Sequence, residues 1–392
     1  MRSKRRIAVV TGTRAEFGLL TPIMHAINAQ PELELQTIAT GMHLSHEFGM
    51  TFQTIENEGF KIDAKVEMLL SSDTPIGISK SIGLGLIGMA DTLDRLEPDL
   101  VLLLGDRFEI LAAAIAATNA RIPIAHIHGG ETTEGMIDES IRHAITKMSL
   151  LHFTAAEPYR QRVIQMGEAP DRVFTVGAPG LDVAARFQPI ERDELEETLD
   201  IQLATPVFAI TFHPVTLERE TSSKQFKALL DALDGYPQAS MVITKPNADT
   251  DGRVIQDLIE AYSAGKPNVG VYTSLGQRRY LSLLAIADVV IGNSSSGIIE
   301  APHFGLPTVN IGDRQLGRIA PLSVIHSDPT AQGIRAAIAK ALDPSFRTSL
   351  RDMVNPYGSG KAAPQITEVL KSFNFHPEVL KKKFYEGGTS SK

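Results

Sequence analysis

Residues 6–14 read Arg-Ile-Ala-Val-Val-Thr-Gly-Thr-Arg. The apolar run at 7–10 is typical of a strand that is buried on both faces of a parallel sheet. Gly12 permits a tight turn after this strand, and the residues that follow have the composition of a helix. A strand that passes through a glycine turn into a helix is the repeating unit of an α/β fold.

The same alternation continues along the first half of the chain. Short apolar runs predict strands at 6–10, 33–39, 100–104, 123–128 and 173–176. Helix-like stretches lie between them at 16–29, 44–58, 76–96, 108–119 and 137–149. This order predicts a parallel, doubly wound sheet with helices on both faces.

A polar and acidic stretch at 186–206 interrupts the pattern, which then restarts. Further strands are predicted at 207–211, 240–244, 269–273, 288–291 and 308–311. We therefore expect an α/β protein of two Rossmann-like, doubly wound domains with a cleft between them. The first domain is predicted at 1–185 and the second at 186–362, with a helix at 363–380 that packs back on the first domain.

Composition excludes several classes of protein and of site. The 392 residues are 43% hydrophobic and 21% charged, as in an ordinary globular protein of about two domains. A net charge of −8 argues against a nucleic-acid partner, which requires a basic face. The absence of cysteine excludes disulfides and thiolate metal sites. No run of 18 apolar residues occurs, and the apolar run after the basic start is too short for a signal peptide. We expect a cytoplasmic protein without a membrane partner.

Polar residues that could perform chemistry follow the predicted strands of the first domain. Arg14 opens a helix after the glycine turn, where an anion would bind. Asp106 follows the strand at 100–104 and fits either a helix cap or a group at the cleft. Alternation along a strand would place His126 and His128 on one side, with Glu131 close by. An acid/base cluster, polar residues that line a domain interface, or a metal site would each explain these three, and we favour them in that order.

Asp138 and Arg142 lie four residues apart on a predicted helix, so they share one face. A functional role and an ordinary ion pair explain that spacing equally well.

The second domain carries a candidate nucleotide site. His213, Lys245 and Asn247 each follow a predicted strand. Small residues at 292–297 precede a helix and form a candidate phosphate cradle, although the pattern of a Walker loop is absent. Glu300 lies one turn inside that helix, where a carboxylate suits a ribose diol better than a phosphate. Arg314 follows the next strand as a second phosphate ligand.

Taken together, these segments resemble the UDP-N-acetylglucosamine 2-epimerase family, and in particular its hydrolysing branch. The resemblance covers nearly all of residues 6–372. The matching strings, in chain order, are GTRAEFG (12–18), GDRFE (105–109), HIHGGE (126–131), DESIRHAITK (138–147), TFHP (211–214), KPN (245–247), GNSSSGIIEAPHFGLP (292–307) and IGDRQLGR (311–318). The family has a GT-B architecture, which agrees with the two α/β domains expected above.

The resemblance implies where substrate binds. UDP would lie on the second domain, and Arg14 and Arg107 would reach its phosphates from the first. The implied UDP-binding residues of the second domain are His213, Lys245, Asn247, Ser294, Ser295, Ser296, Gly297, Glu300 and Arg314. Candidates on the sugar side are His43, Arg142 and His143. We expect no metal and no cofactor, and a homodimer or homotetramer.

The resemblance also implies the reaction, in which UDP leaves C1 by anti elimination and water adds to the resulting 2-acetamidoglucal. The family's catalytic carboxylates correspond to Asp106 and Asp138. Some members carry glutamate where His128 stands and lack one residue before Asp138, so His128 and Glu131 both remain candidates for the second acid/base group. His213 is a further catalytic candidate.

The expected substrate is UDP-GlcNAc, which would give ManNAc and UDP for sialic-acid-type sugar biosynthesis. The nearest alternative is a hydrolysing 2-epimerase of a UDP-2,4-diacetamido-trideoxyhexose in a legionaminic-type pathway. More remote alternatives are a non-hydrolysing 2-epimerase, a GT-B glycosyltransferase and a UDP-sugar-binding protein without activity.

Overall fold

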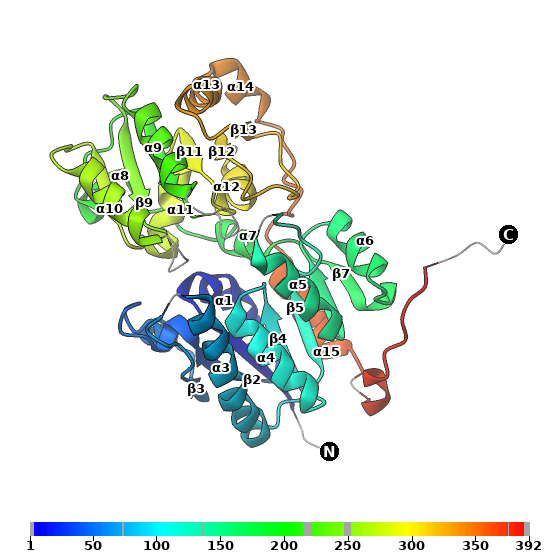
Figure 1. Cartoon of the computed structure of the whole chain (residues 1–392). Helices are drawn as coiled ribbons and strands as arrows, with labels where there is room; N and C mark the ends of the chain where they lie inside the picture. The colour runs from blue at the N-terminus through cyan, green and yellow to red at the C-terminus, as the bar shows by residue number, and fades with distance from the viewer. Residues whose placement is uncertain are drawn as a thin grey trace. The chain divides into compact units, whose positions relative to one another are not determined.

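The computed structural model describes residues 4–72, 74–134, 136–214, 221–246, 252–374 and 376–387. The chain divides into two compact units (Figure 1). The first unit is drawn from Met1–Glu131, Asp138–Val183 and Tyr357–Lys392, and the second from Thr132–Ile137 and Ala184–Pro356.

The first unit is built on a seven-stranded sheet of order β3-β2-β1-β4-β5-β6-β7, in which every adjacent pair is parallel. Its strands are β1 (Arg5–Thr11), β2 (Leu33–Thr40), β3 (Ala64–Val66), β4 (Leu100–Leu104), β5 (Ile124–Ile127), β6 (Leu151–Thr154) and β7 (Val173–Thr175).

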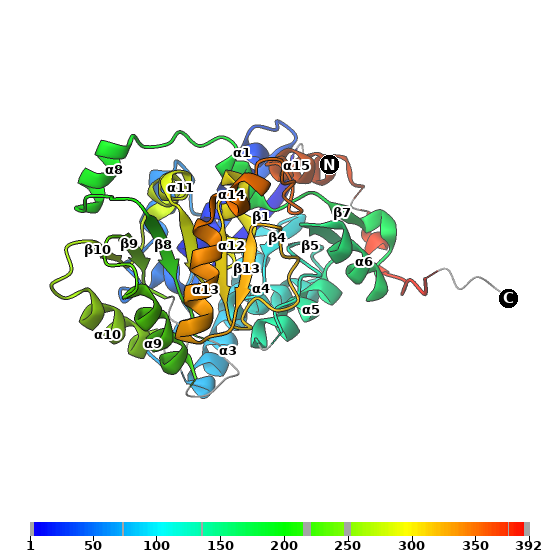
Figure 2. The ribbon, with the colours of Figure 1, turned by 90° about the horizontal axis from the view of Figure 1, so that it is seen from above.

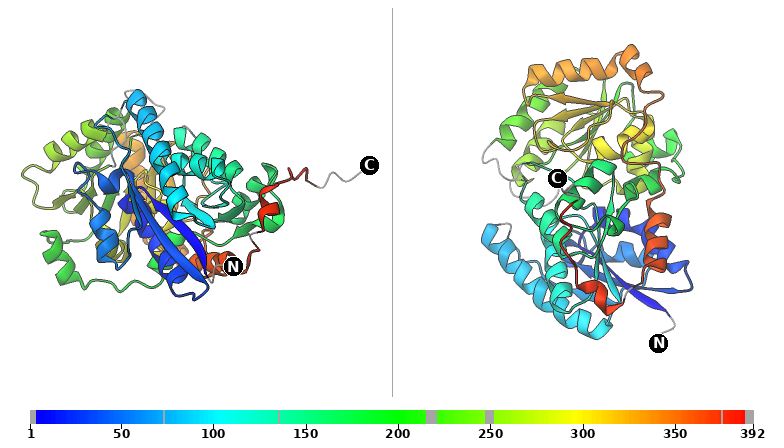
Figure 3. Two further views of the ribbon diagram at one scale, coloured as in Figure 1. Left: turned by 90° about the horizontal axis from the view of Figure 1, so that it is seen from below. Right: turned by 90° about the vertical axis from the view of Figure 1, so that its right-hand side faces the viewer.

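Both faces of this sheet are covered, which explains its continuous apolar strands. Ile7 and Val9 of β1 face a core formed with helices α1 (Arg14–Asn28) and α15 (Ala362–Ser372). Ala8 and Val10 face the opposite core, formed with α3 (Pro75–Leu96) and α4 (Phe108–Asn119). Helix α15 lies beside α1, so the C-terminal part of the chain completes the first core (Figure 3).

The second unit is built on a six-stranded sheet of order β10-β9-β8-β11-β12-β13, again with parallel neighbours. Its strands are β8 (Val207–Thr211), β9 (Ser240–Thr244), β10 (Val269–Tyr272), β11 (Val289–Gly292), β12 (Thr308–Ile311) and β13 (Val324–Ser327). Helices α9 (Ser222–Leu233) and α13 (Ala331–Leu342) pack side by side and share its core (Figure 2).

The remaining helices lie between or after these strands. They are α2 (Phe52–Asn57), α5 (Ile137–Met148), α6 (Glu157–Gln165), α7 (Pro179–Ala184), α8 (Arg192–Leu199), α10 (Gly252–Ser263), α11 (Gly276–Ile286), α12 (Ser296–Ile299) and α14 (Pro344–Ser349), with the 3-10 helices η1 (Gly41–Leu44), η2 (Pro170–Arg172), η3 (Ala301–Phe304) and η4 (Pro377–Leu380).

Two predicted helices are wrong in extent. The helix expected at 44–58 is replaced by η1 and α2, because Gly49 and Met50 adopt left-handed backbone angles between them. The helix expected at 363–380 ends at Ser372, and η4 forms only after an extended Phe373. The strands β3, β6 and β13 were not predicted.

Helix α3 is, among the described residues, the one helix long and apolar enough to cross a membrane by length and composition. It packs along α4 and contributes Met89 and Leu93 to the core of the first unit. Leu84 and Ile87 lie on its exposed side.

A substitution at Gly130 tests how closely the loop after β5 packs against the backbone of Tyr159. It has a left-handed φ of 79°, and a Cβ atom at this position would lie 2.4 Å from the Tyr159 carbonyl oxygen. We expect Gly130→Ala to lower the free energy of unfolding by about 2–4 kcal/mol, through strain and overpacking. Urea-induced unfolding measures the difference.

Gly83→Ala is the matched control. Gly83 is exposed on α3, and a Cβ atom there would meet nothing within 4 Å. Alanine should therefore raise stability by up to about 1 kcal/mol through helix propensity. Equal stability of the Gly130 variant and the wild type would contradict the packing described.

Candidate active site

The candidate site residues of the first unit follow the strands of its sheet and lie at one edge of that sheet. Gly12 follows β1, Gly41 follows β2, Asp106 follows β4 and His128 follows β5. These strands are parallel, so their carboxyl ends meet at the same edge. This is the edge at which ligands of open α/β sheets bind.

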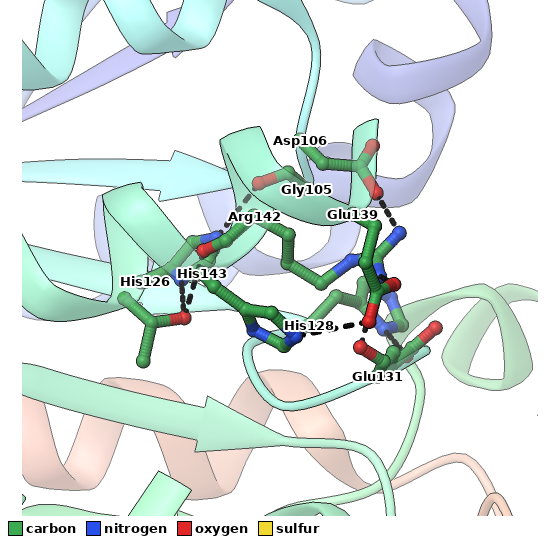
Figure 4. Close-up of polar contacts among 9 residues, drawn as sticks. Gly105, Asp106, His126, His128, Glu131, Glu139, Arg142 and His143 are labelled. Carbon is green, nitrogen blue, oxygen red and sulfur yellow. Dashed lines mark hydrogen bonds and ion pairs between the residues drawn. The ribbon is translucent and has the colours of Figure 1, made fainter. Parts of the chain in front are cut away.

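Arg142, on α5, is the centre of this cluster (Figure 4). Its side chain is 1% exposed and forms ion pairs with Asp106 and with Glu139, the latter at 2.8 Å. It also donates a hydrogen bond of 2.9 Å to the carbonyl oxygen of Glu131. Burial opposes its charge, but the neighbouring carboxylates raise the Arg142 pKa above its usual value. A buried cation therefore holds the β4–α4 turn, the loop after β5 and helix α5 together.

Asp106 differs from Arg142 in its exposure. Its side chain is 23% exposed, so part of the carboxylate faces out of the cluster. The N-cap position of α4 belongs to Arg107, which excludes the helix-cap interpretation of Asp106. Its neighbour in the cluster, Glu139, extends the network by accepting a hydrogen bond of 3.0 Å from His143. Asp138 lies half-buried in the first turn of α5.

His128 and Glu131 form a second, closely coupled pair. His128 Nδ1 lies 2.5 Å from Glu131 Oε1, and the two side chains are 11% and 2% exposed. Strand β5 ends at Ile127, and His128 has a left-handed φ of 67°. The strand alternation that was expected to place His126 and His128 on the same side therefore does not extend to His128. Left-handed backbone at a residue other than glycine costs energy and recurs at functional sites.

His126 instead braces the cluster from inside. It is fully buried, and burial lowers its pKa to about 3, so the ring is neutral. Its Nε2 lies 2.7 Å from the Gly105 carbonyl oxygen, and Nδ1 lies 3.2 Å from the Thr146 hydroxyl. His126 thus links β5 both to the turn that carries Asp106 and to helix α5.

Two buried glutamates, Glu16 and Glu109, were not predicted as part of this edge of the sheet. Glu16 accepts a hydrogen bond of 3.0 Å from the Gly12 N–H, and Glu109 accepts one of 3.3 Å from Arg107 Nε. Among the described residues, Oε1 of both glutamates is buried without a hydrogen-bond partner. Gly12 and Gly41 leave the space that Glu109 occupies, because a Cβ at either would lie within 3.2 Å of it. Both glutamates stand in the matching strings, but their burial was not predictable from those strings.

His43 is not placed as a sugar contact. It is fully buried, with its ring nitrogens 3.1 Å from the Thr11 hydroxyl and 2.8 Å from the Thr51 hydroxyl. Burial lowers its pKa to about 4. His43 therefore ties the end of β1 to Thr51, the residue before α2. Arg14 lies exposed at the start of α1.

In the second unit, Asn293 ties three strand ends together. Its side-chain amide pairs with the His213 backbone, accepting at 2.7 Å and donating at 2.8 Å. Its carbonyl oxygen accepts hydrogen bonds from Arg314 at 3.1 Å and from Gln315 at 2.9 Å. The predicted His213 and Arg314 are thus brought to one place. Asn293 and Gln315 were missed, although both stand in the matching strings.

Three serines, at 294–296, follow Asn293 directly in the sequence. Ser294 and Ser295 are half-buried, and Ser296 lies 2.6 Å from the hydroxyl of the half-buried Tyr280, whose pKa is raised by desolvation. Gly297 packs against Thr308, whose Cγ2 would lie 2.6 Å from a Cβ there. The helix after this loop, α12, spans only Ser296–Ile299, and Glu300 stands where it gives way to η3.

Lys245 is engaged elsewhere, in an ion pair of 2.7 Å with the exposed Glu260. Such surface pairs contribute about 0–1 kcal/mol, so this one would not prevent the lysine from turning to a ligand. Asn247 lies outside the described residues. Within the described ranges, no group of three or more histidine, aspartate or glutamate side chains could hold a metal ion.

Glu16 gives the first unit a specific pH dependence. Burial raises the Glu16 pKa to about 8. The hydrogen bond from Gly12 lowers this pKa, and repulsion from Glu109 raises it. Between about pH 5 and 8 the unfolded chain loses this proton and the folded chain keeps it, so stability falls as pH rises. We expect Glu16→Gln to remove a slope of about 1.4 kcal/mol per pH unit in this window. Parallel pH profiles of unfolding for the two proteins would contradict this.

Comparison with known proteins identifies the family. The family model described as UDP-N-acetylglucosamine 2-epimerase matches residues 25–371. A Campylobacter jejuni protein named GDP/UDP-N,N′-diacetylbacillosamine 2-epimerase (hydrolyzing) is 43% identical, over 83% of this chain and 85% of that protein. The Legionella pneumophila UDP-N,N′-diacetylbacillosamine 2-epimerase (hydrolyzing) is 37% identical, over 96% and 98%. A UDP-N-acetylglucosamine 2-epimerase of Neisseria meningitidis serogroup B is 35% identical, over 86% and 87%.

Solved structures share the fold. The Neisseria meningitidis UDP-GlcNAc 2-epimerase bound to UDP-GlcNAc superposes with a TM-score of 0.79 at 21% identity, over 93% of this chain and 99% of that one. The expected GT-B type of α/β fold, with two parallel and doubly wound sheets, is confirmed. With the family model matched over most of its length and relatives of 35–43% identity, this chain belongs to the UDP-N-acetylglucosamine 2-epimerase family.

Proposed function

We propose that this protein is a hydrolysing 2-epimerase of UDP-N,N′-diacetylbacillosamine, a 2,4-diacetamido-trideoxyhexose, and releases UDP and the free 2-epimer. The observation that carries the reaction type is the acid/base cluster around Arg142. The observation that favours this sugar is that the relatives at 43% and 37% identity bear its name. UDP-GlcNAc, the substrate expected from the sequence, becomes the second candidate and is supported by the relative at 35%.

The reaction requires two proton transfers at one carbon. A base removes the C2 proton while the C1–O bond breaks, and its electron pair leaves with UDP. The intermediate is a glucal with a C1–C2 double bond. Water then adds its oxygen to C1, and an acid delivers a proton to the opposite face of C2. The balance is hydrolysis with inversion at C2, and it needs acid/base groups on both faces of the ring.

Asp106 and His128 fit these two roles best. Asp106 is held by a buried guanidinium yet is partly exposed, so its carboxylate can meet a substrate. Glu131 orients the His128 ring through Nδ1 and leaves Nε2 as the atom that exchanges the proton. We therefore choose His128 from the two candidates that the sequence left open, with Glu131 as its positioning residue. Asp138 remains a candidate beside them.

The second unit supplies the nucleotide site in this proposal. The loop at 292–297 carries the half-buried Ser294 and Ser295. Arg314 lies beside this loop, because it donates a hydrogen bond to the Asn293 carbonyl oxygen. Donors of this kind stabilise the negative charge that develops on the β-phosphate as it leaves. His213, fixed by its backbone pairing with Asn293, is the further group at this site.

The substrate is tested by measuring UDP release and free sugar for three compounds. We expect kcat/KM for UDP-N,N′-diacetylbacillosamine to exceed that for UDP-GlcNAc by at least about tenfold, equivalent to ~1.4 kcal/mol. The GDP-linked sugar is the third compound, because the Campylobacter relative is named for both nucleotides. Preference for UDP-GlcNAc would overturn the proposed sugar, and release only with an added acceptor would indicate a glycosyltransferase.

Asp106→Asn and His128→Gln test the assignment of the two groups. Each should lower kcat by about 10²–10⁴-fold, the usual contribution of a positioned acid or base. UDP affinity, measured by calorimetry, should stay within about threefold of wild type because the nucleotide ligands are unchanged. Asp94→Asn, at an exposed aspartate of α3, is the control and should retain full activity. Full activity of either site variant would remove that residue from the mechanism.

A further inference from the structure

A C-terminal segment of the first unit packs against elements that are far from it in sequence. Residues 379–387, here called the strap, begin in the second half of η4 and continue beyond it (Figure 1). Arg172 donates a hydrogen bond of 3.3 Å to the Val379 carbonyl oxygen, and the Tyr385 N–H donates one of 2.9 Å to the Gly167 carbonyl oxygen. A Cβ at Gly167 would lie 2.2 Å from the Phe384 ring. The strap therefore occupies a space that only glycine leaves open.

Lys382 of the strap completes a buried charge network. Its Nζ lies 2.7 Å from Oε2 of Glu168, whose side chain is 1% exposed. Lys147 contacts the other carboxylate oxygen at 2.5 Å, and His152 Nε2 lies 3.1 Å from Oε2. Burial opposes ionisation, yet these three hydrogen bonds lower the Glu168 pKa to about 2. A buried carboxylate of this kind is costly when one of its partners is removed.

The same ammonium group caps helix α5. Lys382 donates hydrogen bonds to the carbonyl oxygens of Lys147, at 3.0 Å, and Ser149, at 2.6 Å. Carbonyls at the end of a helix lack partners within the helix, and a cation there also interacts favourably with the helix dipole. Lys382 supplies both the hydrogen-bond donors and the positive charge at this helix end, although it lies 235 residues from Lys147 in sequence.

Helix α5 is the helix on which the acid/base cluster depends. Glu139, Arg142 and His143 lie on it, and its Thr146 contacts His126. The helix has twelve residues, too few to be stable without tertiary contacts. Its last turn is tied to the β5 strand through His126 and to the strap through Lys382.

We propose that the strap positions helix α5, and that Lys382 is the positioning residue through which the strap holds Arg142 against Asp106. The structural part of this inference concerns α5 alone. The catalytic part rests on the proposed function, because it requires that Arg142 and Asp106 serve turnover.

The test compares Lys382→Met with Lys381→Met in the full-length protein. Lys381 is 75% exposed and pairs with Glu378 on the surface, so it serves as the matched control. Hydrogen exchange of peptides that cover 137–148 should accelerate by about tenfold in the Lys382 variant and stay unchanged in the control. This corresponds to losing about one hydrogen bond to a charged group. Lys382→Arg should restore protection, because a guanidinium can also donate to both carbonyls.

Turnover provides the second readout. We expect Lys382→Met to lower kcat by about tenfold and leave KM within about twofold, since the nucleotide ligands lie on other elements. Phe384→Ala removes a ring that lies 5.2 Å from Lys147 Nζ but keeps the Lys382 ammonium group, so it should act in the same direction and more weakly. Faster exchange confined to 376–387 with unchanged kcat would overturn the inference. Faster exchange throughout both units would overturn it too, because it would indicate general destabilisation.

The two proposals fail separately. If the wild type turns over none of the three sugar nucleotides, the proposed function fails and the exchange of α5 still decides whether the strap positions that helix. If turnover is present and α5 exchange does not respond to Lys382→Met, the strap inference alone fails.

Discussion

A guanidinium buried at the edge of a parallel sheet constrains this protein more than any other single group. Arg142 is 1% exposed, and an uncompensated charge at that depth would cost several kcal/mol. Asp106, Glu139 and the Glu131 carbonyl compensate it, and they come from the turn after β4, the helix α5 and the loop after β5. Meeting this one requirement therefore brings together the three parts of the chain that form the proposed acid/base site.

Much of the fold follows from local sequence, and the exceptions have physical causes. Strands such as Leu100–Leu104 are predictable because both faces of a parallel sheet demand apolar residues. Strand β6 was missed because His152 and Thr154 interrupt its apolar pattern, although His152 is buried beside Glu168. The helix expected at 44–58 fails at two residues with left-handed backbone, which composition does not reveal.

The candidate site was likewise predictable in part from the sequence. Asp106, Arg142, His213 and Arg314 lie in strings that resemble a known family, so their importance was predictable, whereas the contacts that hold them in place were not. Asn293, Glu16 and Glu109 act through tertiary contacts with residues on other strands or turns. Lys382 is the extreme case, since it caps a helix end 235 residues away in sequence. The resemblance also favoured UDP-GlcNAc, and only the comparison with individual relatives moved the proposed substrate to the 2,4-diacetamido sugar.

The central claim is that a proton is removed from C2 and replaced from the opposite face while the glycosyl bond is hydrolysed. Proton NMR of the enzyme with UDP-N,N′-diacetylbacillosamine in D2O measures this directly. We predict UDP together with a free 2-epimer that carries one deuterium at C2. A free sugar that retains protium and its original configuration at C2 would contradict the account, because it would indicate simple hydrolysis without elimination.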